Sequence, residues 1–189
     1  MNSIFGALFV IIYLVSGAAM AQQDRSTMPS KTAENTTSLT AAMKFVQDSL
    51  NAVGRVTYTV HGHDSTNGHD WTNAFSNETS RVTANPTTCR INYHFKSIRD
   101  GNVTMDANAG FLLKDVLNID VLTRQKYFDE ANLLNGHPSW VANVEPPVFV
   151  VRIRRTANVE NQFVFFDEVT ATRVAKALTH AVELCANTK

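Results

Sequence analysis

The first 21 residues constrain this chain most, because they indicate the compartment in which the rest of it folds. They read MNSIFGALFVIIYLVSGAAMA, an apolar run followed by small residues and Ala19-Met20-Ala21. This pattern is typical of a secretory signal peptide with an A-x-A cleavage site. We therefore expect residues 1–21 to be removed and the mature protein to be exported, either periplasmic or secreted. The alternative is an uncleaved N-terminal anchor helix.

No segment of the chain is expected to stay in a membrane after cleavage. The uncharged part of the leader, residues 4–15, is well short of the roughly 20 residues needed to span a bilayer. No later segment approaches that length without a charge. Removing the leader leaves 189 − 21 = 168 residues, which suits a single domain with a tail. We expect a flexible tail over residues 22–37 and one globular α+β domain over residues 38–187.

The charge balance narrows the class of partner. The chain holds 17 basic and 17 acidic residues, and a net charge of zero argues against a general nucleic-acid binder, which needs a basic surface. A protein, peptide or small-ligand partner, recognised by shape and local chemistry, is the expectation.

Only two cysteines are present, Cys89 and Cys185. An even number of cysteines in an oxidising compartment favours a disulfide, here between residues 185 − 89 = 96 positions apart. The alternative is two separate buried thiols.

Apolar periodicity predicts a helix near each end of the domain. The first covers residues 38–53, where apolar residues recur at three- and four-residue steps before Gly54. The second covers residues 167–185, with Asp167 as its N-cap and one apolar stripe along its length. Its members are Ala171, Val174, Ala175, Leu178, Ala181, Val182 and Cys185.

Alternating patterns predict strands between these helices. A strand is expected over residues 55–63, then a long loop over 64–88 with at most one irregular strand, and a strand from Cys89 that turns at Asp100-Gly101-Asn102. Further strands are expected over residues 103–105, 111–116, 119–122, 148–155 and 162–166. Residues 124–134 are predicted as a short helix or an ordered loop.

This order of elements, antiparallel strands followed by one closing helix, resembles the pleckstrin-homology-like arrangement. The closing segment FVFFDEVTATRVAKALTHAVELC also resembles the C-termini of uncharacterised exported bacterial proteins. The resemblance covers about residues 55–186. It implies a curved antiparallel sheet or partly open barrel with an N-terminal helix and a C-terminal capping helix. Phosphoinositide binding would need basic residues in the first inter-strand loop. Arg81 is the one basic residue there, against Asp64, Asp70 and Glu78, so we do not expect this chain to bind lipid headgroups.

The segment VHGHDSTNGHDW holds the densest set of metal-ligating side chains. His61 and His63 alternate onto one side of a predicted strand, and His69 follows with Asp64 and Asp70 nearby. Zinc or copper accepts imidazole and carboxylate ligands of this kind. The alternative interpretation is two solvent-facing histidines on a strand that runs into a polar loop.

Two other groups invite a functional interpretation. Arg152, Arg154 and Arg155 on one predicted strand either clamp an acidic partner or form its solvent face. Trp71, Phe75, Tyr127 and Trp140 either line a groove or anchor their loops to the core.

No nucleophile elbow, P-loop, dinucleotide fingerprint or C-x-x-C pair is present, so the sequence lacks a complete catalytic set. The leading hypothesis is a non-enzymatic exported binding module without a cofactor. The alternative is a metal-binding or metal-dependent protein that uses His61, His63 and His69.

Overall fold

The structure, a computed structural model, describes residues 31–137, 139–156 and 159–187. The predicted signal peptide and residues 22–30 of the predicted tail lie outside this part of the chain. Three α-helices are described, and they are α1 (Lys31–Val53), α2 (Arg124–Leu134) and α3 (Glu168–Ala186). Helix α1 therefore begins inside the segment that was predicted to be a flexible tail, residues 22–37. Residues 124–134, predicted as either a short helix or an ordered loop, form a helix.

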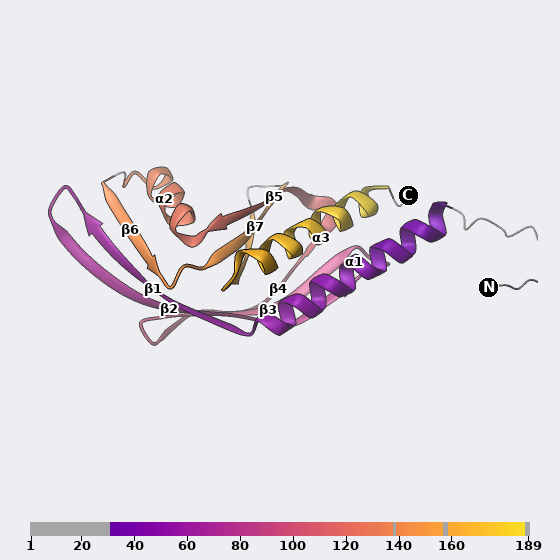
Figure 1. Ribbon diagram of the computed structural model, residues 1–189, viewed down its shortest axis with the longest axis horizontal. Coiled ribbons are helices and arrows are strands. Elements are labelled where there is room, and N and C mark those ends of the chain that lie inside the picture. The colour runs from indigo at the N-terminus through magenta and orange to yellow at the C-terminus, as the bar shows by residue number, and fades with distance from the viewer. Residues whose placement is uncertain (1–30, 138, 157–158, 188–189) are drawn as a thin grey trace, which may run out of the picture.

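Eight strands form two antiparallel sheets in the described residues (Figure 1). The larger sheet has the order β4-β3-β2-β1-β6, with β1 (Arg55–Asp64), β2 (His69–Asn85), β3 (Arg90–Arg99), β4 (Asn102–Leu112) and β6 (Trp140–Glu145). The smaller sheet has the order β5-β7-β8, with β5 (Val116–Thr123), β7 (Phe149–Arg155) and β8 (Glu160–Phe165). A short 3₁₀ turn, Leu113–Asp115, connects β4 to β5.

These sheets confirm the α+β class and correct its details. The strands lie in two sheets rather than one, and they do not close into a barrel. The segment over residues 64–88, predicted as a long loop with at most one irregular strand, is mostly strand, because β2 occupies residues 69–85 and pairs with β1 and β3. The irregular strand that the prediction allowed is present and is longer than expected. The sequence pattern does not predict β6. One continuous β4 covers the strand predicted over residues 103–105 and the start of the one predicted over residues 111–116, which is interrupted by the 3₁₀ turn.

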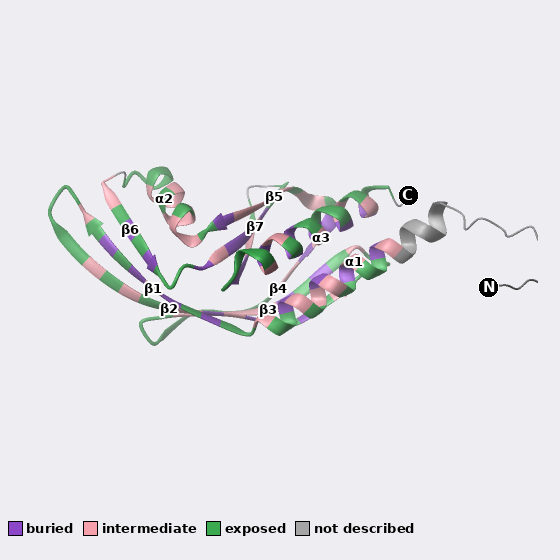
Figure 2. Ribbon diagram, viewed as in Figure 1, coloured by how far each residue is buried: buried purple, intermediate pink, exposed green. Residues whose placement is uncertain are grey.

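Each strand of the larger sheet has an inner and an outer face. Along β1, Val56, Tyr58 and Val60 are buried on the inner face, which is turned toward α2 and the smaller sheet, while His61 and His63 are exposed on the outer face. Strand register carries this division across the sheet, because residues directly opposite each other point to the same side. Figure 2 shows the alternation along β1 and β6.

The core has two parts. The larger part joins α1, α3, the smaller sheet and the β2–β4 end of the larger sheet, and its largest buried side chains include Met43, Phe111, Phe163 and Phe165. The smaller part lies under α2. It is built from buried residues of β1 and β6, together with Val148, which precedes β7, and Val164 of β8. Helices α1 and α3 pack side by side (Figure 1), and the stripe predicted for α3 is buried except for Val182, which is half-buried.

Cys89 and Cys185 lie at disulfide distance, with their Cα atoms 6.0 Å apart. The pair links the turn between β2 and β3 to the last turn of α3. Among the described residues, no helix is long and apolar enough to cross a membrane.

Candidate functional site

The three predicted metal ligands do not share one face of the sheet. His61 and His63 lie on the outer face of β1, where His63 Nδ1 is 2.7 Å from Asp70 Oδ1 and His61 Nδ1 is 3.2 Å from the Thr72 hydroxyl. Since His63 pairs with Asp70 in the β1–β2 register, the preceding residue His69 points to the opposite, inner face. The hairpin thus brings His61 and His63 together and separates His69 from them.

In the described ranges no group of three or more His, Cys, Asp or Glu side chains is placed to hold a metal ion. Zinc or copper binding at these histidines stays a prediction. The contact that the structure shows for His63 is local. His63 and Asp70 form an exposed ion pair across the β1–β2 hairpin when the imidazole is protonated.

Two of the three β7 arginines, Arg152 and Arg154, bind acidic groups of the same chain, whereas the Arg155 guanidinium lies 5.9 Å from the Phe111 ring centroid. Arg152, whose side chain is 12% exposed, contacts Asp120 Oδ2 at 3.1 Å and Glu130 Oε2 at 2.6 Å. Burial alone would raise the pKa of Asp120, but hydrogen bonds from Asn118 and Arg152 hold it below its ordinary value. For Arg152 the solvent-face interpretation is therefore wrong, because this side chain ties α2 to the smaller sheet.

The strongest candidate binding site is a cavity of about 430 Å³ on the inner face of the larger sheet. We call it the aromatic groove, and four half-buried rings line it: Trp71 and Phe75 of β2, Phe128 of α2, and Trp140 of β6. The ring centroids of Trp71 and Trp140 are 6.3 Å apart, and those of Phe75 and Phe128 are 6.1 Å apart. The groove therefore has apolar walls on both sides.

Neighbouring residues hold the two tryptophan rings in place along the groove. Trp71 pairs with Gly62 of β1, and a Cβ atom built on Gly62 would overlap the Trp71 indole. Glycine is thus required for the indole to lie flat on β1. On the other wall, His137 stacks on Trp140, with ring centroids 4.2 Å apart and planes 13° from parallel.

Polar groups surround the mouth of the groove. Arg99 donates two hydrogen bonds to Asn73 Oδ1, at 3.0 and 2.8 Å, and its guanidinium lies 5.9 Å from the Phe75 ring centroid. Asp64 Oδ1 accepts from the Thr66 backbone N–H and the Ser139 hydroxyl. The Thr66 N–H contributes most to holding the pKa of Asp64 below its ordinary value. The groove thus combines apolar walls with one fixed anion and one fixed cation.

A second cavity of about 490 Å³ continues along the same inner face toward β8. Here the Arg124 guanidinium carbon lies 4.7 Å from the Tyr127 ring centroid and 4.8 Å from that of Phe128, and Nη1 donates to Gln162 Oε1 at 2.7 Å. Burial raises the pKa of Tyr127 and of Tyr58. These contacts fix α2 over the sheet and so fix the Phe128 wall of the groove.

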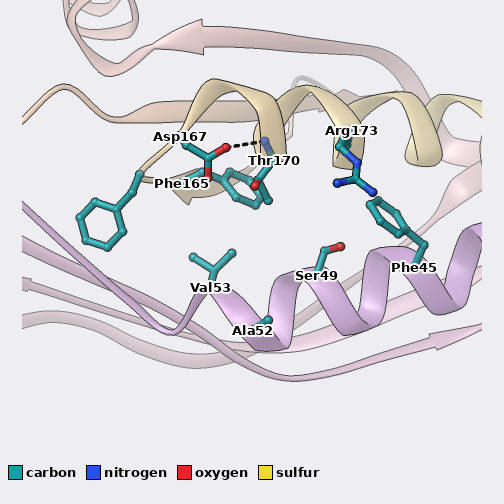
Figure 3. Close-up of a pocket in the computed structure, with 9 residues that line it drawn as sticks. Phe45, Ser49, Ala52, Val53, Phe165, Asp167, Thr170 and Arg173 are labelled. Carbon is teal, nitrogen blue, oxygen red and sulfur yellow. Dashed lines mark hydrogen bonds between the residues drawn. The ribbon is translucent and has the colours of Figure 1, made fainter.

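A third cavity, of about 410 Å³, lies between α1 and the start of α3 (Figure 3). Its two charged side chains already have roles in the fold. Asp167 caps α3 by accepting the Thr170 backbone N–H at 2.7 Å, and the Arg173 guanidinium lies 5.3 Å from the Phe45 ring centroid. Three phenylalanines line this crevice, against the four rings of the aromatic groove.

The sequence identified part of the groove. Of the four aromatic residues considered, the structure brings Trp71, Phe75 and Trp140 together, whereas Tyr127 points to Arg124 and Phe128 takes its place. Alternation along β3 places Arg99 on the inner face with Phe95, a signal that was open to sequence reasoning. Comparison with protein families, curated proteins and solved structures finds no match to this chain.

Proposed function

We propose that this protein is an exported, non-enzymatic binding module whose aromatic groove takes a small ring-containing ligand with polar substituents. One observation carries the proposal: four half-buried aromatic rings line an open cavity of about 430 Å³. Aromatic side chains left unburied around a concave surface stabilise a bound ring by dispersion and by stacking.

The polar residues of the groove suit recognition rather than proton transfer. Asp64 is held in its ionised form by donors of its own chain, so it can accept hydrogen bonds from a ligand but has no proton to give at neutral pH. Arg99, whose Nε also lies 3.7 Å from Asp100 Oδ2, places a positive charge beside Phe75. A ring with hydroxyl or carboxylate substituents, such as a sugar or an aromatic acid, matches this arrangement.

Export is part of the proposal. The predicted leader over residues 1–21 supports it, and so does the disulfide-distance pair Cys89 and Cys185, because disulfides persist in oxidising compartments. The pleckstrin-homology-like identity and the family resemblance stay predictions.

Tryptophan fluorescence tests the groove directly, because the chain has two tryptophans and both line this cavity. We expect a saturable change in emission when methyl glycosides or benzoate are added to the disulfide-intact protein. Phe75→Ala should weaken the affinity for the ligand about tenfold, since a ring contact contributes on the order of 1 kcal/mol in addition to the apolar area that it buries.

Phe166→Ala is the matched control, because Phe166 is 49% exposed and lies outside the groove. The proposal predicts that this variant responds like the unmodified protein. An unchanged emission with both ligand classes, or an equal loss in the two phenylalanine variants, would contradict it.

A further inference from the structure

The outer face of the larger sheet carries a cavity that the proposed function does not use. It has a volume of about 420 Å³ and lies over β2, β3 and β4. The side chains and backbone that line it include two arginines, one histidine, two asparagines and one glycine: Arg81, Arg90, His94, Asn92, Asn108 and Gly110. Among the described residues no carboxylate lines this cavity, which we call the arginine pocket.

Arg81 reaches the arginine pocket from an irregular position in β2. The β2–β3 register shifts between Ser80 and Thr83, so Arg81 lies in a bulge, and its φ is 53°. A non-glycine residue in this left-handed region is strained, and such strain is often retained where a side chain has a function. Within the described part of the chain, the Arg81 side chain has no hydrogen-bond or ion-pair partner.

Arg90 of β3 and Gly110 of β4 also line the arginine pocket. Arg90 Nε donates to Asn92 Oδ1 at 2.8 Å, which orients the guanidinium and leaves its terminal N–H groups free for a ligand. A Cβ atom on Gly110 would lie 2.5 Å from Asn92 Oδ1 and 2.8 Å from the Ile91 carbonyl oxygen. Because residue 110 has no side chain, the Asn92 side chain can lie against its backbone, and the arginine pocket stays open at this position.

The acidic groups nearest along the outer face already have cationic partners. Asp106 contacts His94 Nε2 at 2.9 Å and Lys96 Nζ at 3.3 Å, and the Lys96 hydrogen bond contributes most to holding the Asp106 pKa below its ordinary value. Glu78 contacts Arg55 at 3.2 Å. The positive charges of Arg81 and Arg90 are therefore not neutralised by these neighbours.

We propose that the arginine pocket binds an oxyanion, the phosphate or carboxylate group of a small ligand, between the guanidinium groups of Arg81 and Arg90. Arginine presents paired donors that match both anions, and the Asn92 and Asn108 amides add neutral hydrogen bonds. This site lies on the sheet face opposite the aromatic groove, so it does not depend on the proposed function.

Titration with inorganic phosphate and with acetate tests the proposal on the full disulfide-intact chain. The backbone amide resonances of Arg81 and Gly110 are followed by ¹H–¹⁵N NMR, with chloride at equal ionic strength as the reference. We expect a saturable shift with phosphate, acetate or both. The phosphate arm identifies a phosphate ligand, and the acetate arm a carboxylate ligand.

Arg81→Gly removes the guanidinium while keeping a residue that adopts positive φ readily, so the variant should stay folded. Loss of charge-assisted hydrogen bonds should weaken binding about tenfold or more. Lys176→Gln, which removes one exposed positive charge from α3, is the matched control and should bind like the unmodified protein. No saturable shift with either anion, or equal binding by the Arg81→Gly variant, would overturn the proposal.

Discussion

The side-chain amide of Asn51 hydrogen-bonds both backbone groups of Val82. Its Nδ2 donates to the Val82 carbonyl at 3.0 Å, and its Oδ1 accepts from the Val82 N–H at 2.9 Å. Strand β1 pairs with β2 only as far as residue 78, so the following residues of β2 have no strand on that side. Asn51, together with Gln47 Oε1 at 2.9 Å from the Ala84 N–H, lets helix α1 satisfy this open edge.

Asn51→Ala should lower the free energy of unfolding by about 2 kcal/mol, because it leaves two partly buried backbone groups without partners. Urea unfolding followed by circular dichroism measures this loss. Asp48→Ala, also on α1, removes only an exposed ion pair with Lys44 and should cost about 0.5 kcal/mol or less. Equal losses in both variants would show that the amide bridge has no special role.

Gly62→Ala should displace the Trp71 indole from its place on β1, because the added methyl group would overlap the ring. We expect tryptophan emission at longer wavelength as the ring gains contact with water, and a free energy of unfolding lower by about 1–3 kcal/mol. Thr57→Ala, on the outer face of the same strand, should leave the emission unchanged. An unaltered spectrum for Gly62→Ala would argue against the geometry of the groove.

Asp120→Asn should destabilise the protein at pH 7 by about 2 kcal/mol, because it weakens the hydrogen bonds that the carboxylate accepts from Arg152 and Arg154. The folded-state pKa of Asp120 is below its ordinary value. Its contribution is therefore complete above the unfolded-state pKa of about 3.9 and is lost as the pH falls through the folded-state value.

The gap in unfolding free energy between the unmodified protein and Asp120→Asn should consequently narrow as the pH falls from about 4 to about 2. Urea unfolding at several pH values measures it. Asp129→Asn serves as the control, since Asp129 is exposed on α2 and accepts a hydrogen bond from Gln125. A gap of constant size across this range would mean that the Asp120 charge does not stabilise the fold.

Replacing Cys89 and Cys185 with serine should lower the free energy of unfolding by about 2–4 kcal/mol. The cross-link spans 96 residues of sequence, so its removal frees a long loop in the unfolded chain. Urea unfolding with and without reductant provides the check, because reductant should affect the unmodified protein and not the double variant. Intact-mass measurement should show hydrogen gained at both sulfurs on reduction; free thiols before reduction would refute the cross-link.

Local periodicity predicted the elements that bury a complete apolar stripe. Leu39, Met43, Val46 and Leu50 are all buried in α1, and the stripe of α3 is buried in the same core except for Val182, which is half-buried. The hairpin at Asp100-Gly101 also follows from its turn residues, since both adopt positive φ there. In these segments the pattern and the tertiary contacts agree.

Strand β2 could not be recognised in this way, because its inner face is only partly covered. Trp71, Asn73 and Phe75 border the aromatic groove, and Asn77 lies next to them, buried and donating to the Tyr58 hydroxyl at 3.0 Å. An open cavity thus replaces part of the apolar alternation that identifies a strand. The β1–β2 hairpin places His69 on the face opposite His61 and His63. The spacing of the histidines in the sequence does not reveal this, because it depends on the register of the hairpin.

The link between Cys89 and Cys185 also bears on how the molecule would survive a protease. Exposed sites such as the β3–β4 turn at Asp100-Gly101 and the end of α2 at Leu134 lie between the two cysteines in sequence. A single cut at either place would leave two fragments that are still covalently joined and still packed around one core. Nicked molecules should therefore keep the size and shape of the intact protein, and gain only the mass of one water, until the sulfurs are reduced.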